Sequence, residues 1–333
     1  MPNDTSNTRS RLRAAAVWLA ALLLTATAAQ ANEFVIPGPD ASVVGETRIV
    51  KAREGDTLLD IARRHKVGYE EIRLANPGVD TWLPGAGTEV VVPTQFVLPD
   101  APREGIVVNV PEMRLYYFPE PRSGDSARVI TYPISVGRGD WQTPLGRTEV
   151  IRKDRDPAWY PPESIRAEHA ARGDYLPKYV PPGPDNPLGA YSLRLGLPGY
   201  LIHGTNRPYG IGMKVTHGCL RLYPEDIASL FAAVSPGTPV RIVNQAAKAG
   251  WLDGRLYVEI HPEFNGDDER RPANLTPLVD AVLSATGSLP SDDVIDWESV
   301  YAIARVSNGI PGTVSTGRTG ISAGGSAEIG LAD

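Results

Sequence analysis

The sequence predicts a mostly β protein with one small α+β module ahead of its largest domain. The chain holds 33 Gly and 31 Pro among 333 residues, which indicates a fold rich in turns and loops. Between residues 104 and 243, short apolar segments alternate with turn residues, as in a mostly antiparallel sheet. Residues 47–93 instead have the order strand, helix, helix, strand. Because 42% of the residues are hydrophobic, the chain can also bury a substantial core.

Residues 1–31 are predicted to be a signal peptide. Three arginines precede an apolar run over 14–29, and Ala29-Gln30-Ala31 gives the small-x-small pattern of a cleavage site. We therefore expect export, with Asn32 as the first residue of the mature chain. An uncleaved membrane anchor is the alternative. Residues 32–46 are expected to form a linker.

Charge and cysteine content narrow the function. The formal net charge is −6 and no Lys/Arg cluster occurs beyond the N-terminus, which argues against a nucleic-acid partner. Cys219 is the single cysteine. Exported proteins usually pair their cysteines or lack them. A lone thiol is therefore either a reactive group or an inert, buried side chain, and composition alone does not choose between them.

The segment 47–93 has local signals for each of its elements. A strand is expected at 48–52, followed by a turn at Gly55-Asp56, where Asp56 or Thr57 can cap a helix. Leu58, Ile61 and Ala62 recur at helical spacing. A second helix is expected at 69–75, ended by Asn76-Pro77-Gly78, and a closing strand at 90–93.

This segment, VKAREGDTLLDIARRHKVGYEEIRLANPGVDTWLPGAGTEVVVP, resembles a LysM module over nearly its whole length. The resemblance rests on the GDTL turn, the IA of the first helix, the AN-P after the second helix and the PG before the last strand. It implies binding of glycan strands of the cell wall at Gly55, Asp56, Thr57, Asn76 and Pro77. The alternative is a packing domain without a ligand.

Residues 104–243 are predicted to form the main domain. A hairpin is expected from 106–110 and 114–118, and a helix at 226–233. The long Pro- and Gly-rich excursion 154–190 is expected to be functional, because loops of this length are uncommon inside compact domains. Further strands are expected at 129–136, 148–152, 191–195, 200–203, 215–220 and 239–243.

The remaining chain has no functional interpretation. Residues 244–310 form a C-terminal extension of unknown role, with a strand at 256–260 and helices at 277–283 and 297–306. The Gly/Ser/Thr-rich tail 311–333 is expected to be disordered.

The stretch IHGTNRPYGIGMKVTHGCLRLYPEDI, residues 202–227, concentrates the reactive side chains. His217 lies two residues before Cys219 and His203 lies 219 − 203 = 16 before it. If 217–219 is extended, His217 and Cys219 share a face, with the strand of His203 beside them. An imidazole can take the thiol proton and leave an ion pair that lowers the pKa of the cysteine. A zinc site of these three residues, or two structural histidines around a buried thiol, are the alternatives.

The same stretch resembles the L,D-transpeptidase catalytic domain of the YkuD type, whose signature is an upstream His followed by Ser/Thr-His-Gly-Cys. His203 and Thr216-His217-Gly218-Cys219 match it. TPLGRTEVIRKDRDPAWYPPESIRAE, GPDNPLGAYSLRLGLPGYLIHGTN and THGCLRLYPEDI resemble the periplasmic branch that attaches an outer-membrane lipoprotein to peptidoglycan. The resemblance covers roughly 104–243. It implies a β-sandwich or barrel and favours the nucleophile interpretation of Cys219.

The resemblance also implies a role for each residue of the motif. Cys219 corresponds to the nucleophile, and His203 to the general base and acid, held by a backbone carbonyl near Gly204. Arg221 is expected to bind a stem-peptide carboxylate, with a structural salt bridge as the alternative. Four further residues are expected to support the site and to stabilise the oxyanion: Thr216, His217, Gly218 and Gly204.

The implied reaction needs no metal and no organic cofactor. Cys219 attacks the L-centre carbonyl of a diamino acid in a tetrapeptide stem, D-Ala leaves, and an amine resolves the thioester. The amine belongs to another stem or to an outer-membrane lipoprotein, and carbapenems are expected to acylate the thiol. The alternatives are a hydrolase that cuts the same bonds and a non-catalytic wall-binding LysM protein. We expect deletion of 47–93 to leave activity on small soluble muropeptides.

Overall fold

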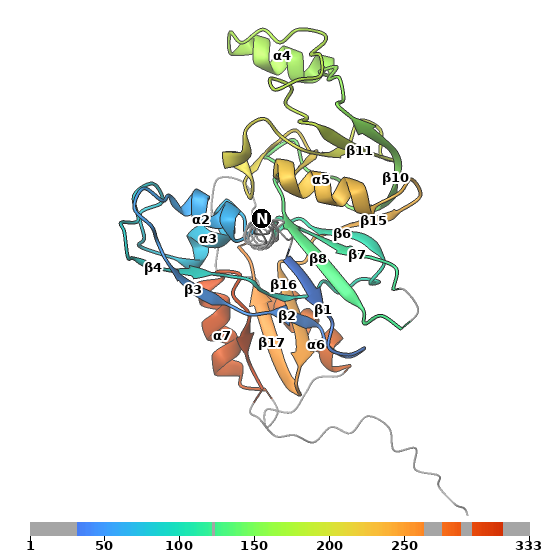
Figure 1. The fold of residues 1–333 in the computed structure, drawn as a ribbon. Helices are drawn as coiled ribbons and strands as arrows, with labels where there is room; N and C mark the ends of the chain where they lie inside the picture. Colours follow the sequence, from blue (N-terminus) through green and yellow to red (C-terminus); the bar gives the residue numbers. More distant parts are fainter. Residues whose placement is uncertain (1–31, 122–123, 263–274, 288–294, 316–333) are drawn as a thin grey trace, which may run out of the picture. The chain divides into compact units, whose positions relative to one another are not determined.

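The computed structural model describes residues 32–121, 124–262, 275–287 and 295–315 (Figure 1). The predicted signal peptide lies outside these residues. In the described part of the chain, none of the helices has both the length and the apolar character needed to cross a bilayer.

The main domain is built on a nine-stranded sheet in the order β1-β8-β7-β6-β15-β10-β11-β12-β14. Two pairings are parallel, β15 with β6 and β12 with β14, and the others are antiparallel. The strands are β1 (Asn32–Val35), β6 (Gly105–Asn109), β7 (Arg114–Phe118), β8 (Arg128–Pro133), β10 (Gly146–Arg155), β11 (Tyr191–Leu195), β12 (Leu201–His203), β14 (Leu220–Arg221) and β15 (Pro239–Val243).

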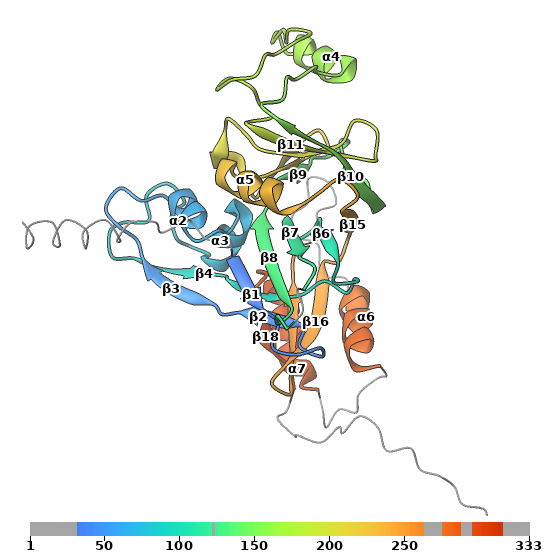
Figure 2. The ribbon, with the colours of Figure 1, turned by 45° about the vertical axis from the view of Figure 1, so that its right-hand side comes forward.

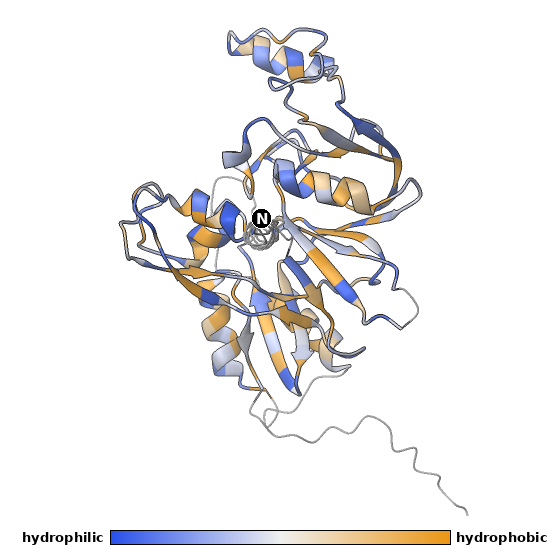
Figure 3. Cartoon of the chain, viewed as in Figure 1, coloured by the Kyte–Doolittle hydropathy of each residue, from blue (hydrophilic) through white to orange (hydrophobic). Residues whose placement is uncertain are grey.

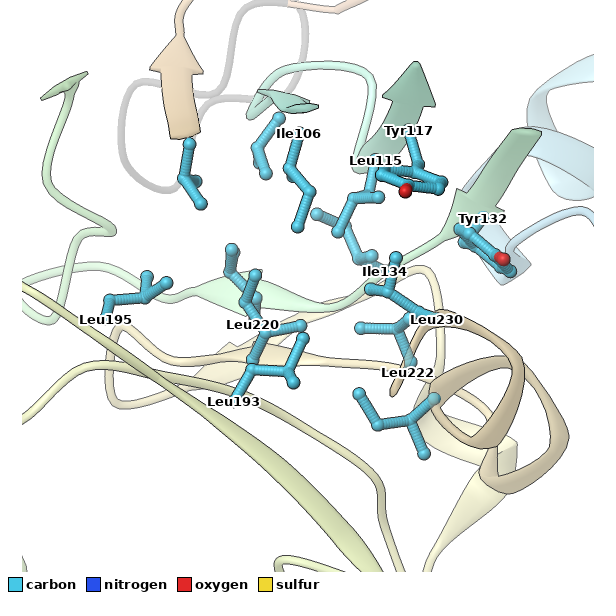
Figure 4. Close-up of a cluster of buried hydrophobic side chains, with 14 of the residues drawn as sticks. Ile106, Leu115, Tyr117, Tyr132, Ile134, Leu193, Leu195, Leu220, Leu222 and Leu230 are labelled. Atoms are coloured by element: carbon cyan, nitrogen blue, oxygen red, sulfur yellow. The ribbon is translucent and has the colours of Figure 1, made fainter. Parts of the chain in front are cut away.

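The sheet encloses the core of this domain between its two halves. Figure 4 shows Leu193 and Leu220, from the half that carries the motif, facing Ile106 and Leu115 from the other half. Helix α5 (Pro224–Ala233) closes the core with Ile227 and Leu230, as its amphipathic sequence requires. Figure 3 shows hydrophobic positions recurring along the strands of this sheet. The predicted mostly β fold class is confirmed.

The LysM module has the predicted order of elements. Strand β3 (Arg48–Lys51) pairs with β4 (Glu89–Val92), and two helices lie between them in the sequence, α2 (Leu58–Arg64) and α3 (Tyr69–Ala75). Thr57 rather than Asp56 caps α2, in a capping box with Asp60. The buried faces of both helices pack on the two strands, so the module has its own core.

The expected linker 32–46 instead forms two strands. Strand β1 adds to the edge of the large sheet, with Phe34 opposite Val129. Strand β2 (Val43–Gly45) pairs with β5 (Gln95–Val97). The prediction was wrong because both partners are distant in sequence, so no local pattern announces the pairing.

The C-terminal extension forms a layer of its own. Strands β16 (Ala247–Leu252), β17 (Arg255–Ile260) and β18 (Gly312–Thr313) make a three-stranded sheet packed against α6 (Leu275–Thr286) and α7 (Trp297–Val306). Strand β18 lies inside the expected disordered tail, so order extends past residue 311. Residues 316–333 lie outside the described part.

A buried ionic network ties this layer to the large sheet. Lys248 Nζ lies 2.8 Å from Glu112 and 2.8 Å from Glu259, while His261 Nε2 lies 2.6 Å from Glu259. The two carboxylates and the imidazole are close enough to share a cation. The lysine ammonium already occupies that position, so we interpret the cluster as structural.

Candidate active site

The predicted base ends strand β12, and the predicted nucleophile directly precedes the neighbouring strand β14. In the parallel pair of β12 and β14, Ile202 lies opposite Leu220 and His203 opposite Arg221. Ile202 and Leu220 point into the core, so the alternate strand residues His203 and Arg221 belong to the other face.

His203 is held as a neutral base. Its ring is buried, and Nδ1 lies 2.7 Å from the Gly204 carbonyl, which can only accept a hydrogen bond. The proton therefore sits on Nδ1 and leaves the lone pair of Nε2 free. Burial, reinforced by the charge of Arg221, lowers the pKa of His203 to about 3. The imidazole stays uncharged near neutral pH and is ready to accept a proton.

Cys219 is a neutral thiol at rest. Its Sγ lies 3.7 Å from the Gly199 carbonyl. Burial raises the pKa of the thiol above its usual value, although a hydrogen bond with the Leu201 backbone and the charge of Arg221 act in the opposite direction. This differs from the ion pair expected from the sequence.

The catalytic motif is a turn rather than part of one strand. Strand β13 (Lys214–Thr216) ends before it and β14 starts after it. Gly218 has φ +97°, a conformation that favours glycine. The Thr216 hydroxyl accepts from the N–H of Gly218 (3.2 Å) and donates to the Cys219 carbonyl (2.6 Å). The strand predicted at 215–220 is therefore wrong.

Close packing fixes this turn. A Cβ on Gly218 would lie 2.7 Å from the ring of Tyr200 and 3.2 Å from the Gln142 carbonyl, so only glycine fits here without a shift of its neighbours. Thr143 Oγ1 donates to the Gly218 carbonyl at 2.9 Å. The Thr216 hydroxyl occupies the N–H of Gly218.

The His217 side chain is directed away from the nucleophile. Its Nε2 lies 2.7 Å from Glu168 Oε2 on α4 (Glu163–Ala171), and its ring meets the edge of Trp141 at 4.9 Å between centroids. Arg138 pairs with the same glutamate. Figure 2 shows α4 on the excursion that connects β10 to β11.

The zinc hypothesis for the motif is not supported. The ring nitrogens of His203 and His217 that make hydrogen bonds are directed to Gly204 and Glu168, respectively. Among the described residues, the groups that could share a metal ion do not include Cys219. The ring of His217 is therefore held by Glu168, whereas the ring of His203 is held by the Gly204 carbonyl.

Arg221 is a cation with unused hydrogen-bonding capacity. Its Nε is buried and has no hydrogen-bond partner, and it pairs with no carboxylate in the part of the chain that the structure describes. Burial lowers the pKa of its guanidinium, and the neighbouring Cys219 opposes this effect. These facts disfavour a structural salt bridge and suit a ligand with an oxygen acceptor.

The first loop expected to bind glycan is a tight polar turn. Gly55 is exposed and has φ +78°. The Asp56 carboxylate accepts a hydrogen bond from the Arg53 N–H at 2.8 Å and pairs with Arg64, whose hydrogen bond lowers the pKa of Asp56. Because the Thr57 hydroxyl caps α2, its role in this loop is partly structural.

The second loop combines a structural amide with an exposed aromatic ring. The Asn76 side chain is buried and donates to the carbonyls of Ile72 (2.8 Å) and Val91 (2.7 Å). Its amide is therefore engaged inside the module, whereas Pro77 is exposed. Trp82, which was not predicted from the sequence, is 66% exposed on the same loop.

Family models match both domains. Residues 103–242 match the L,D-transpeptidase catalytic domain, and residues 50–93 match the LysM domain. The protein named probable L,D-transpeptidase YcfS from Escherichia coli K12 is 40% identical over 298 residues, which cover 88% of this chain and 91% of that protein. This chain belongs to the L,D-transpeptidase family.

Other relatives of this L,D-transpeptidase extend the comparison. The probable L,D-transpeptidase YbiS from Escherichia coli K12 is 40% identical over 283 residues, covering 82% of this chain and 90% of that protein. A crystal structure of an L,D-transpeptidase from Mycobacterium tuberculosis H37Rv aligns with 48% of this chain and 64% of its own at 19% identity, with a TM-score of 0.30. The family and the relatives confirm the prediction of an enzyme.

Three polar residues of this L,D-transpeptidase support the motif without having been predicted to do so. Thr143 holds the Gly218 carbonyl, and Glu168 with Arg138 holds His217. For Glu168, the unusual length of its excursion was the single indication of function.

Proposed function

We propose that this L,D-transpeptidase uses Cys219 to cleave tetrapeptide stems of peptidoglycan and to transfer the shortened stem to an amine. The acyl group transferred is the carboxyl at the L-centre of a diamino acid, and D-Ala leaves. One observation supports the proposal: the parallel pairing of β12 and β14 sets His203, held by the Gly204 carbonyl, opposite Arg221, whose Nε is buried without a partner, and Cys219 directly precedes β14.

In the first half of the reaction, Cys219 Sγ attacks the stem carbonyl while its proton passes to His203 Nε2. The negative charge that develops on the carbonyl oxygen is stabilised by the N–H groups of His217 and Cys219. The carbon–nitrogen bond then breaks. His203 returns its proton to the departing amino group of D-Ala, and a thioester remains on Cys219.

In the second half, an amine attacks the thioester. His203 accepts a proton from the amine, the carbon–sulfur bond breaks, and Cys219 regains the proton as a thiol. Another stem gives a cross-link, and a lysine of an outer-membrane lipoprotein gives an anchored lipoprotein. Water in place of the amine gives hydrolysis, as in the carboxypeptidase alternative.

Arg221 is proposed to bind a carboxylate of the stem peptide. Its buried, unpaired Nε needs an acceptor, and a carboxylate provides a charge-assisted one. A β-lactam of the carbapenem type offers both an activated carbonyl and a carboxylate. We therefore expect carbapenems to acylate Cys219.

The LysM module is proposed to bind the glycan strands of the wall. The N–H of Leu58 donates to the Thr81 carbonyl at 2.9 Å, which holds the loop of Trp82 beside the Gly55 turn. An exposed indole next to polar turn residues suits a sugar ring. With the signal peptide expected over 1–31, these features support an exported, periplasmic protein.

Incubation of the chain lacking residues 1–31 with a disaccharide-tetrapeptide, followed by mass spectrometry, tests the reaction. A dimer that has lost one D-Ala indicates transpeptidation, and a tripeptide indicates hydrolysis. We expect Cys219→Ala to abolish both products, and His203→Ala to reduce them about a hundredfold or more. Substantial turnover by Cys219→Ala would overturn the assignment of the nucleophile.

Sedimentation with purified sacculi tests the glycan proposal. We expect Trp82→Ala to bind sacculi about tenfold more weakly, because one stacked aromatic ring is worth about 1 kcal/mol or more. Its Tm should match that of the parent protein, since the ring is 66% exposed. Unchanged binding would count against this face of the module.

A further inference from the structure

The LysM helix α3 holds the loop that leads into the catalytic motif. The first N–H groups of a helix have no partner within it. Here Tyr69 N–H donates to the Ile211 carbonyl at 3.0 Å, and the next N–H donates to the Gly212 carbonyl at 3.2 Å. Gly212 has φ +84°, and a Cβ on it would lie 2.5 Å from Gly68 Cα. The two backbones are therefore in direct contact, immediately before β13.

The LysM helix α2 holds the chain on the other side of the motif. Arg63 forms two 2.9 Å hydrogen bonds with the carboxylate of Glu225, in a bidentate pair. Lys66, just beyond the end of α2, places its Nζ 2.8 Å from Asp226, which is almost completely buried. Both acids belong to the first turn of α5, which follows β14.

These two contacts bracket the nucleophile closely. Gly212 lies 216 − 212 = 4 residues before Thr216, and Glu225 lies 225 − 219 = 6 residues after Cys219. The turn between them has few regular pairings of its own, because β13 has three residues and β14 has two. A displacement of about 1 Å at a reacting atom can cost about a hundredfold in rate. The anchors are therefore close enough to set the position of Sγ.

We propose that the LysM module positions the catalytic segment, with Arg63 and Lys66 acting as positioning residues for the reaction of Cys219. The inference rests on Cys219 being the nucleophile. It replaces the expectation from the sequence that deletion of residues 47–93 leaves the activity on small soluble muropeptides unchanged. Deletion would remove the N–H donors that hold the 211–212 loop and the cation that pairs with buried Asp226.

The test compares charge variants of the full mature chain on substrates that do not use the glycan face. Arg63→Glu places a carboxylate against Glu225, and the double variant Arg63→Glu/Glu225→Arg restores an opposite pair. Arg48→Glu is the matched control, because Arg48 lies in the same module and pairs only with exposed Glu46 among the described residues. The rate of Cys219 acylation by a carbapenem is followed by intact mass, and kcat and KM are measured on a soluble disaccharide-tetrapeptide.

We expect Arg63→Glu to slow acylation about tenfold or more and to lower kcat with little change in KM, because the stem-binding groups are untouched. The double variant should recover part of the loss, because Lys66 lies 3.5 Å from Glu225 and opposes a cation there, and Arg48→Glu should match the parent protein. If Arg63→Glu does not fold, Lys66→Met takes its place with the same expectation. Equal acylation rates in all folded variants would overturn this inference but not the proposed function. Failure of the parent protein to become acylated at Cys219 would overturn the proposed function and the inference with it.

Discussion

The buried ion pair between the LysM module and the large sheet gives the sharpest stability prediction. Arg114 is completely buried, and its guanidinium donates to Glu71 through Nε (2.8 Å) and a terminal nitrogen (2.7 Å). Replacing Glu71 with Ala leaves this charge buried and unpaired, which costs about 3–5 kcal/mol. It also removes the carboxylate that caps the Gly68 N–H, worth about 1 kcal/mol.

We therefore expect Glu71→Ala to lower the free energy of unfolding by about 4–6 kcal/mol, a large part of the about 5–15 kcal/mol of a typical protein. The fall in Tm should be about 10 °C or more. Circular dichroism during urea and thermal unfolding measures both quantities. Glu70→Ala is the control: its partner Arg73 lies on the same helix and is partly exposed, so we expect a loss below about 1 kcal/mol. A loss below about 1 kcal/mol for Glu71→Ala would refute the argument.

Four further predictions concern the motif and the glutamate that holds His217. Alkylation of Cys219 by iodoacetamide should accelerate with rising pH, with a midpoint above that of a free thiol, because burial raises the pKa of Cys219. Arg221→Gln should move the midpoint higher still, because the charge of Arg221 lowers this pKa; a lower midpoint would contradict the assigned sign. Gly218→Ala should slow acylation about a hundredfold or more, because the φ of +97° and the neighbouring Tyr200 ring exclude a Cβ. The acylation rate is measured by intact mass, and a near-normal rate would show that the turn can relax. Glu168→Gln should lower the pKa of His217 further, because Glu168 favours the charged imidazole. NMR titration of the His217 ring measures this pKa, and a higher value in the variant would contradict the prediction.

The LysM module could be predicted almost to the residue because its signals are local. The caps, the apolar positions and the turn residues all lie within a few positions of the elements that they define. The predicted helix 69–75 matches α3, and the predicted closing strand at 90–93 overlaps β4. The membership of the L,D-transpeptidase family was also predictable, because His203 and Thr216-His217-Gly218-Cys219 match the signature of that family.

Features set by distant partners could not be predicted. Strand β1 depends on β8, about a hundred positions away in the chain, and its sequence was taken for a linker. Strand β16 was missed because AKAGWL has little β propensity of its own. The motif was expected to be extended, but the Thr216 hydroxyl and the tight packing of Gly218 favour a turn. Contacts between the module and the motif have no signature in either segment alone.

Strand β1 also has a consequence for how the protein is prepared and handled. It covers one long side of β8, and the Asn32 amide reaches the Lys66 carbonyl at 3.2 Å. A recombinant protein that begins at residue 37 would lack β1 and would expose the unpaired backbone N–H and C=O groups of β8. An exposed edge strand can pair with strands of other molecules. The protein that begins at residue 37 should therefore self-associate under conditions in which the protein that begins at Asn32 does not.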